Sequence, residues 1–240
     1  MSRGIFITGT GTDVGKTYVT GLIVKKLHEM GKRAAYYKAA MSGNVREDDG
    51  KLLPGDALQV KRTAGIGQAV EEMCPYVYEA AVSPHLASRL EGEPVRLDVV
   101  KQGFAALLGS YDYITVEGSG GIACPLRFDT EKILLGEMIR TLGLPCLIVA
   151  DAGLGTINAV VLTAEYMERR GIPVKGIILN RFHAGNIMEE DNKRMCEYLT
   201  EIPVLGCIEE GCRELPVEQD TLLGLYEEIG EGLDDDLVSV

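Results

Sequence analysis

Residues 4–17 read GIFITGTGTDVGKT, an apolar run followed by a glycine- and threonine-rich loop that ends in Gly15-Lys16-Thr17. From Val19 to Met30 the apolar residues then recur at helical spacing. This strand–loop–helix pattern is typical of a phosphate-binding loop. Backbone N–H groups and the helix N-terminus surround phosphate oxygens in such a loop. Lys16 is therefore expected to reach the β- and γ-phosphates, and the Thr17 hydroxyl to bind Mg²⁺.

The loop departs from the strict motif at one position. The strict motif has glycine six residues before the lysine, where this chain has Thr10, with Gly9 one place earlier. The alternative interpretation is a chance Gly-Lys-Thr at the start of a helix. Average composition gives roughly 0.05 such tripeptides in a chain of this length, and the flanking strand and helix favour the phosphate-binding loop.

Short apolar runs recur along the chain and alternate with helix-length amphipathic segments. The runs are continuous rather than alternating, which is typical of strands buried on both faces. This pattern predicts an α/β fold in which a mostly parallel, twisted sheet carries helices on both faces. The further runs cover residues 34–37, 113–116, 146–150, 176–179 and 204–206.

The domain organisation expected from the sequence is simple. We expect one domain over residues 1–226 and a frayed or solvated tail over residues 227–240, which hold six acidic residues and no basic one. The polar, turn-rich stretch from Ser42 to Gly55 is expected to be a mobile loop.

The net charge of the chain limits the classes of ligand that it is expected to bind. The chain has 24 Lys and Arg against 36 Asp and Glu, a net charge of −12, which argues against broad nucleic-acid or anionic-membrane binding. No apolar run approaches the ~20 residues of a membrane span, and no signal peptide is visible at the N-terminus. None of the six cysteines forms a C-x-x-C pair. We therefore expect a reduced, cytoplasmic protein.

Polar residues follow the second and third apolar runs, where an open parallel sheet binds its ligands. Lys38 follows the second run and fits either a second cation over the transferring phosphate or an ordinary surface lysine. Glu117 follows the third run and precedes Gly118-Ser119-Gly120-Gly121. Thr17, Asp56 and Glu117 would suit Mg²⁺, which takes one or two carboxylates together with phosphate oxygens and waters. Asp56 alone also fits a helix N-cap.

The fourth and fifth runs end in features that leave two interpretations open. Asp151 is followed by a glycine turn that opens a helix, so its amides could bind an anion. Equally, this is a plain strand–helix turn capped by Asn158. After the fifth run, the Asn180 amide could hydrogen-bond to the edge of an adenine base, or it could only stabilise the turn in which it lies.

With these residues in place, the chain resembles the dethiobiotin synthetase family from its first strand to about Gly211. The chain departs from the family at two places. Ala39 stands where the family commonly has proline after the motif lysine. Residues 206–211 lack the usual proline after the last strand, which puts adenine contacts by that segment in doubt. The matching pieces, in the family's order, are residues 9–17, Tyr37-Lys38 with Ser42-Gly43, residues 55–57, 74–76, 83–85, 116–121 and 154–158, and Asn180.

The resemblance implies a P-loop NTPase-type fold, ATP and Mg²⁺ as cofactors, and 7,8-diaminononanoate and CO₂ or bicarbonate as substrates. The implied reaction forms a carbamate, then a carbamic–phosphoric anhydride, and then the cyclic urea of dethiobiotin. The implied catalytic residues are Lys38, Lys16 and Thr12. The implied nucleotide contacts are Asp13, Val14, Gly15, Lys16, Thr17, Tyr18, Asp56, Glu117, Gly118, Ser119, Gly120, Asn180 and Arg181. The implied substrate contacts are Ser42, Gly121, Thr156, Ile157 and Asn158. The last three belong to a turn that, in the family, helps to hold the substrate carboxylate across a homodimer interface.

Other classes share this pattern. Partitioning ATPases of the ParA/MinD type typically carry an extra lysine five residues before the loop lysine, where this chain has Gly11. Amidotransferase-type ligases, such as cobyrinate diamide synthase, carry a further glutaminase domain. A regulatory domain that has lost catalysis is the third alternative, and the intact Lys16, Lys38 and Glu117 argue against it.

Overall fold

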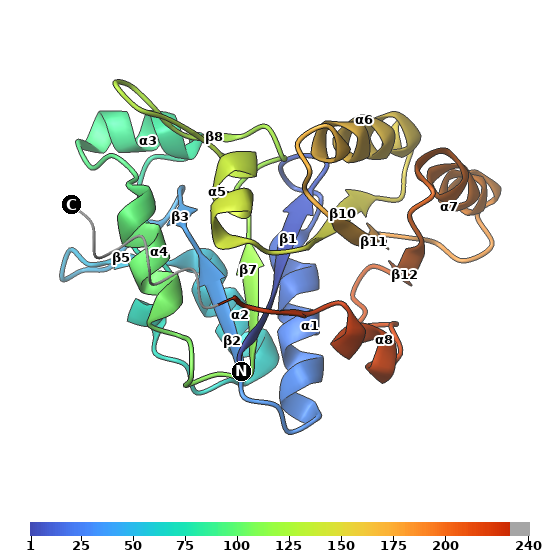
Figure 1. The fold of residues 1–240 in the computed structure, drawn as a ribbon, viewed down its shortest axis with the longest axis horizontal. Coiled ribbons are helices and arrows are strands. Elements are labelled where there is room, and N and C mark those ends of the chain that lie inside the picture. The colour runs from blue at the N-terminus through green and yellow to red at the C-terminus, as the bar shows by residue number, and fades with distance from the viewer. Residues whose placement is uncertain (231–240) are drawn as a thin grey trace.

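A computed structural model describes residues 1–230 of the chain, and Figure 1 shows their arrangement. The strands are β1 (Arg3–Gly9), β2 (Ala34–Lys38), β3 (Ala40–Met41), β4 (Val45–Arg46), β5 (Leu52–Leu53), β6 (Tyr76–Val77), β7 (Tyr113–Glu117), β8 (Pro125–Phe128), β9 (Lys132–Leu134), β10 (Cys146–Asp151), β11 (Val174–Asn180), β12 (Val204–Ile208) and β13 (Glu227–Glu228). The helices are α1 (Lys16–Glu29), α2 (Gly55–Ala64), a 3₁₀ turn at Val70–Glu72, α3 (Pro84–Glu91), α4 (Leu97–Ala105), α5 (Leu135–Leu142), α6 (Thr156–Glu168), α7 (Ile187–Thr200) and α8 (Gln219–Gly224).

The central sheet has the strand order β12-β11-β10-β1-β7-β2, and these strands are all parallel. The predicted α/β fold is confirmed. The loop-bearing strand β1 lies in the middle of the sheet, between β10 and β7. No helix within residues 1–230 is both long and apolar enough to cross a bilayer.

Successive residues of each central strand point to opposite faces, and each face has its own apolar core. Ile5 and Ile7 of β1 pack with residues of α1, α2 and α8. Phe6, between them, packs with residues of α3 to α7 on the other face. In Figure 1, α3 and α4 lie beside one end of the sheet and α6 and α7 beside the other. This double burial explains why the strand sequences are continuously apolar.

Two segments differ from the sequence-based expectation. Residues 42–55 contain the antiparallel hairpin β4–β5, with Val45 opposite Leu53. The Asn44 side chain fixes the base of this hairpin, because its amide donates to the Tyr78 carbonyl at 2.8 Å and its oxygen accepts from the Gly55 N–H at 2.9 Å.

Glu227 and Glu228, expected in the tail, form β13 and pair antiparallel with Gly4 and Arg3 of β1. β10 pairs with β1 only from Phe6 onward, so the first residues of β1 leave an edge that β13 fills. Ion pairs of Glu228 with Arg3 and of Glu227 with Lys175 compensate the two carboxylates. The rest of the expected tail, residues 231–240, lies outside the described residues, and the single domain over residues 1–226 stays a prediction.

β2 is the outer strand of the sheet, and the Gln68 side chain pairs part of its free edge, while the Met73 carbonyl accepts from the Lys38 N–H at 2.8 Å. The oxygen of the buried Gln68 amide accepts from the Tyr36 N–H at 2.8 Å, and its nitrogen donates to the Tyr36 carbonyl at 3.0 Å. Gln68 therefore pairs both backbone groups of Tyr36 in place of a further strand.

We predict that Gln68→Ala lowers the free energy of unfolding by roughly 2–4 kcal/mol, because it leaves two buried backbone groups unpaired at about 1–3 kcal/mol each. Urea denaturation followed by circular dichroism measures the change. The control Gln102→Ala, at an exposed position of α4, should change stability by no more than about 0.5 kcal/mol. Equal stabilities of the two variants would contradict the edge-closing role of Gln68.

Candidate active site

The loop between β1 and α1 leaves the N-terminus of α1 open. Gly15 is the N-cap of the helix and has a φ of +92°, in the left-handed region, and no side chain caps the first turn. A Cβ atom at this position would lie 2.0 Å from Nδ2 of Asn180, so only glycine fits. The free N–H groups at this end of α1 can therefore meet a phosphate group, as the motif predicts.

The end of β11 holds this loop in place. Asn180 Nδ2 donates to the Val14 carbonyl at 3.0 Å. Arg181 Nη2 donates to the Asp13 carbonyl at 2.8 Å, and its Nη1 pairs with Asp151 Oδ2 at 2.7 Å. Asp13 and Arg181 both have positive φ values, of 60° and 55°. Asn180 and Arg181 thus fix the conformation of the phosphate loop, and adenine contact by Asn180 stays a prediction.

A cleft of about 570 Å³ lies between this loop, the ends of β2 and β7, and the start of α2. It brings together most of the predicted site residues. It also includes three residues that the sequence analysis missed: Ala40 and Met41 lie between Lys38 and Ser42 of the predicted lysine segment, and Gln59 lies one helical turn after Asp56. The predicted residues that line it are Thr12, Asp13, Gly15, Lys16, Thr17, Tyr18, Lys38, Ser42, Asp56, Glu117, Ser119, Gly120 and Arg181.

A charged cluster forms the floor of the cleft. The Lys38 ammonium lies 2.6 Å from Asp56 Oδ2 and 2.6 Å from Glu117 Oε1. Thr17 Oγ1 donates to the same Glu117 oxygen at 2.8 Å. Lys38 and Glu117 are paired residues of β2 and β7, which explains their proximity. The interpretation of Lys38 as an ordinary surface lysine is wrong, because the side chain is 7% exposed.

Burial and neighbouring charge act in opposite directions on the two lysines. Burial alone would lower the pKa of Lys38, but Glu117 and Asp56 outweigh it and raise the pKa above its usual value. The pKa of Lys16 is lowered, first by burial and then by the positive charge of Lys38. The cleft therefore holds two cations close together, a combination suited to a polyanionic ligand.

Tyr36 is a further member of the cluster that the sequence analysis missed. Its hydroxyl donates to Glu117 Oε2 at 3.1 Å, and its side chain is fully buried. Burial raises the pKa of the phenol, with Glu117 adding to the effect, so the hydroxyl stays protonated. The one signal in the sequence is spacing, because Tyr36 stands two residues before Lys38 and thus on the same face of the strand.

The donor set at this position suits Mg²⁺. Thr17, Asp56 and Glu117 offer only oxygen atoms, and the Lys38 ammonium already bridges the two carboxylates. Within residues 1–230 no group of three or more His, Cys, Asp or Glu side chains is placed to hold a metal ion. A cation here would therefore depend on nucleotide phosphates and water for its remaining ligands, as is usual for Mg²⁺.

Comparison with known proteins identifies the family of this site. A family model described as AAA domain matches residues 3–211. The ATP-dependent dethiobiotin synthetase BioD of Clostridium botulinum (strain Loch Maree / Type A3) is 47% identical over 95% of this chain and 100% of its own length. The enzyme of the same name from Brachyspira hyodysenteriae is also 47% identical, over 90% of this chain and 96% of its own.

The chain belongs to the dethiobiotin synthetase family.

Solved structures resemble this member of the dethiobiotin synthetase family in fold alone. The MinC:MinD cell division protein complex of Aquifex aeolicus matches with a TM-score of 0.54 and 16% identity, over 87% of this chain and 82% of that chain. A ParA family ATPase from Chlorobium tepidum matches with a TM-score of 0.53 and 13% identity, over 93% and 90%. These likenesses confirm the P-loop NTPase-type fold.

Two glycines of the predicted set contribute through close packing. A Cβ atom at Gly118 would lie 2.9 Å from side-chain atoms of Phe6 and Leu135. At Gly121 it would lie 3.5 Å from the backbone of Gly9 and Gly11, so the second glycine segment packs directly on the phosphate loop. The predicted residues that do not line the cleft are Val14, Gly118, Gly121, Thr156, Ile157, Asn158 and Asn180.

Three of these residues open α6, at a separate place. Gly155 is the N-cap of α6, and no side chain caps the helix, so the interpretation of Asn158 as a cap is wrong. The Thr156 side chain is buried, and its hydroxyl has no hydrogen-bond partner among the described residues. Asn192 of α7 holds the preceding turn through the Ala152 carbonyl at 2.9 Å. The N-terminus of α6 is thus held in place by α7, and it carries the buried Thr156 hydroxyl, which has no hydrogen-bond partner among the described residues.

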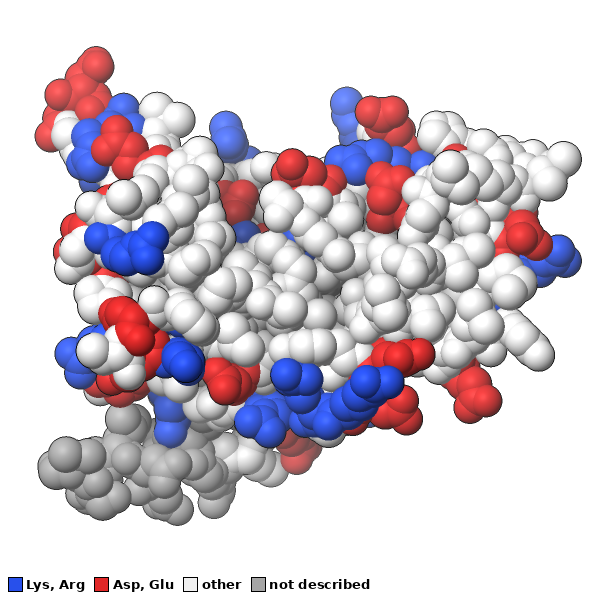
Figure 2. Space-filling view, turned by 90° about the horizontal axis from the view of Figure 1, so that it is seen from above, with Lys and Arg blue, Asp and Glu red and all other residues white. Residues whose placement is uncertain are grey.

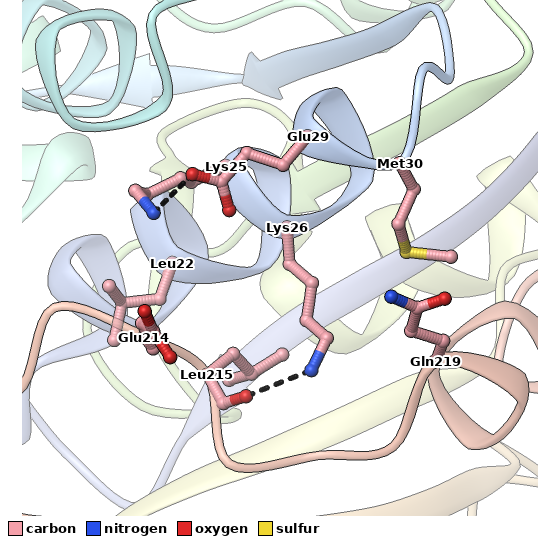
Figure 3. Close-up of a pocket in the computed structure, with 8 residues that line it drawn as sticks. All are labelled: Leu22, Lys25, Lys26, Glu29, Met30, Glu214, Leu215 and Gln219. Atoms are coloured by element: carbon pink, nitrogen blue, oxygen red, sulfur yellow. Dashed lines mark hydrogen bonds and ion pairs between the residues drawn. The ribbon is translucent and has the colours of Figure 1, made fainter.

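A smaller hollow, of about 240 Å³, lies between α1 and the segment that leads to α8, and Figure 3 shows its lining residues. Lys26 donates there to the Leu215 carbonyl at 3.1 Å and also to the Val217 carbonyl. About two turns earlier in α1, at the cleft, the Tyr18 hydroxyl donates to the Cys212 carbonyl. These contacts fix the segment after β12 along α1, and any adenine contact by residues 206–211 stays a prediction.

Proposed function

We propose that this chain is an ATP- and Mg²⁺-dependent dethiobiotin synthetase, a ligase of biotin biosynthesis that acts on 7,8-diaminononanoate and CO₂. The observation that carries the proposal is 47% identity to an enzyme of this name over its full length, in a chain whose cleft brings together the phosphate loop, Lys38 and Glu117. No described contact favours a partitioning ATPase. The face in Figure 2 carries basic and acidic side chains side by side rather than a broad basic area.

The reaction proposed for the cleft has three steps. One substrate amine captures CO₂ as a carbamate. A carbamate oxygen then attacks the γ-phosphorus of ATP and displaces ADP, which gives a carbamic–phosphoric anhydride. The second amine attacks the carbonyl carbon of this anhydride, closes the five-membered urea ring and releases inorganic phosphate.

The second step brings two anions together, and the residues of the cleft would offset their repulsion. Lys16, Lys38 and the free N–H groups of the phosphate loop supply positive charge in a partly desolvated site. Thr17, Asp56 and Glu117 would hold Mg²⁺, which when bound supplies further positive charge at the phosphate oxygens. Positioning and electrostatics, rather than a nucleophilic side chain, carry the rate in this scheme.

We also propose that the substrate carboxylate binds at the start of α6 of a partner subunit in a homodimer. Thr156 and Asn158 do not line the cleft of their own chain, and a second copy can supply them. Large apolar side chains are exposed around this helix: Leu154 is 91% exposed, Leu162 58% and Ile187 of α7 86%. Such a group is typical of a surface that another protein covers.

A cytoplasmic location is the remaining part of the proposal. Its support is that all six cysteines are unpaired thiols, as expected in a reducing compartment. Cell fractionation that recovers the protein outside the cytoplasmic fraction would contradict it.

The reaction class is tested by measuring phosphate release from Mg-ATP with and without 7,8-diaminononanoate and bicarbonate. We expect release only when both are present, together with a product whose mass exceeds that of the diamine by one carbonyl less two hydrogens. Phosphate release at the same rate with and without the diamine would contradict the assignment to this reaction class. It would leave an ATPase of unassigned substrate.

We predict that Lys38→Gln folds but loses at least ~10²–10³-fold in kcat, the usual cost of removing one preorganised charge-stabilising group. Steady-state phosphate release and circular dichroism measure the two properties. The control is Lys51→Gln, at a lysine that is 61% exposed and pairs with Glu71. It should retain the parent activity. Near-normal turnover by Lys38→Gln would remove this lysine from the mechanism.

For the dimer we predict a solution mass of twice the 26.0 kDa of one chain, measured by sedimentation equilibrium. Asn158→Ala should raise the KM for 7,8-diaminononanoate more than the KM for ATP, because Asn158 lies outside the nucleotide cleft. An equal rise in both constants would count against a carboxylate contact, and a monomeric mass against the shared site.

A further inference from the structure

The two oxygens of the Glu117 carboxylate have different partners. Oε1 accepts hydrogen bonds from Thr17 Oγ1 at 2.8 Å and from Lys38 Nζ at 2.6 Å, two residues that line the cleft. Oε2 accepts only from the Tyr36 hydroxyl, at 3.1 Å, among the described residues. The carboxylate is buried, so each oxygen depends on these protein donors rather than on bulk water.

Tyr36 is itself firmly held. The residue is fully buried in β2 and belongs to the core shared with α1 and α2. Gln68 pairs both of its backbone groups, at 2.8 and 3.0 Å. Tyr36 and Lys38 stand two residues apart, so they share one face of the strand, and Lys38 is paired directly with Glu117 across β2 and β7. The phenol oxygen is therefore a fixed point behind the carboxylate.

We infer that Tyr36 is a positioning residue for Glu117, whose hydroxyl holds Oε2 and thereby turns Oε1 toward Thr17 and the cation site. This inference rests on the proposed role of Glu117 as a Mg²⁺ ligand. A carboxylate that lacks such a partner can rotate about its terminal bond, which has a broad, two-fold torsional profile. Partners behind a metal ligand fix its orientation, and their loss typically costs about 10–100-fold in metal affinity or activity.

The neighbouring tyrosine offers a matched control. Tyr37 is as deeply buried as Tyr36, but it points to the opposite face of the sheet, against α4. Its hydroxyl donates to the Val100 carbonyl at 2.8 Å, away from the charged cluster. Tyr36→Phe and Tyr37→Phe therefore each remove one buried, hydrogen-bonded hydroxyl from adjacent positions, and only the first touches Glu117.

The test compares the parent protein, Tyr36→Phe, Tyr37→Phe and Glu117→Gln by two readouts. The first is the dissociation constant of Mn²⁺ from the full-length protein with equimolar ADP, measured from the free-Mn²⁺ EPR signal and corrected for ADP alone. The second separates the KM for Mg²⁺ from kcat at saturating ATP. We expect Tyr36→Phe to weaken Mn²⁺ binding about tenfold or more and to raise the KM for Mg²⁺, and Tyr37→Phe to match the parent.

Each outcome decides one assignment. Parent-like Mn²⁺ binding by Tyr36→Phe, or equal weakening in both tyrosine variants, would overturn the positioning role. Unchanged Mn²⁺ binding in Glu117→Gln would instead overturn the proposed metal site. Glu117→Gln that weakens Mn²⁺ binding while Tyr36→Phe does not would leave that site intact and refute only the inference about Tyr36.

Discussion

The candidate site depends on a buried ion pair between neighbouring strands, Lys38 of β2 and Glu117 of β7. A charge removed from water is costly unless it is paired and hydrogen-bonded. Here the pairing is complete, because Asp56, Thr17 and Tyr36 supply the remaining partners. The same requirement fixes the local structure around it: α2 must begin where it presents Asp56, and α1 where it presents Thr17. Loss of Lys38 or of Glu117 would leave the other buried without its charged partner, so these two residues act as a unit.

The sequence predicted the fold well, because strands buried on both faces leave continuous apolar runs that few other structures produce. It also predicted the cleft residues that follow strand ends, since parallel strands bring those ends to one edge. Spacing along the chain does not give register across the sheet, however. The direct pairing of Lys38 with Glu117, and the use of Lys38 to bridge two carboxylates, became visible only in the structure.

Tyr36 shows why the rest of the site was not predictable. In the sequence it is one of two adjacent tyrosines in an apolar run, and both fit an ordinary core. Their hydroxyls have different roles only because one faces Glu117 and the other faces α4. The hairpin β4–β5 and the strand β13 were missed for a related reason. Residues 42–51 are mostly polar or glycine and β13 consists of two glutamates. Contacts between residues distant in sequence, from Asn44 to Tyr78 and from Arg3 to Glu228, stabilise these elements.

The pairing of β13 with β1 joins the two ends of the described chain, and this has a consequence for biosynthesis. β1 carries the phosphate loop, yet its neighbours β7, β10 and β13 all lie far later in the chain. Contacts this distant in sequence form slowly, because the intervening chain must be ordered before they can close. The phosphate loop thus depends on contacts that can form only after distant parts of the chain have been made. A nascent chain therefore cannot complete the nucleotide site until the segment through Arg181, which lines the cleft, has been synthesised.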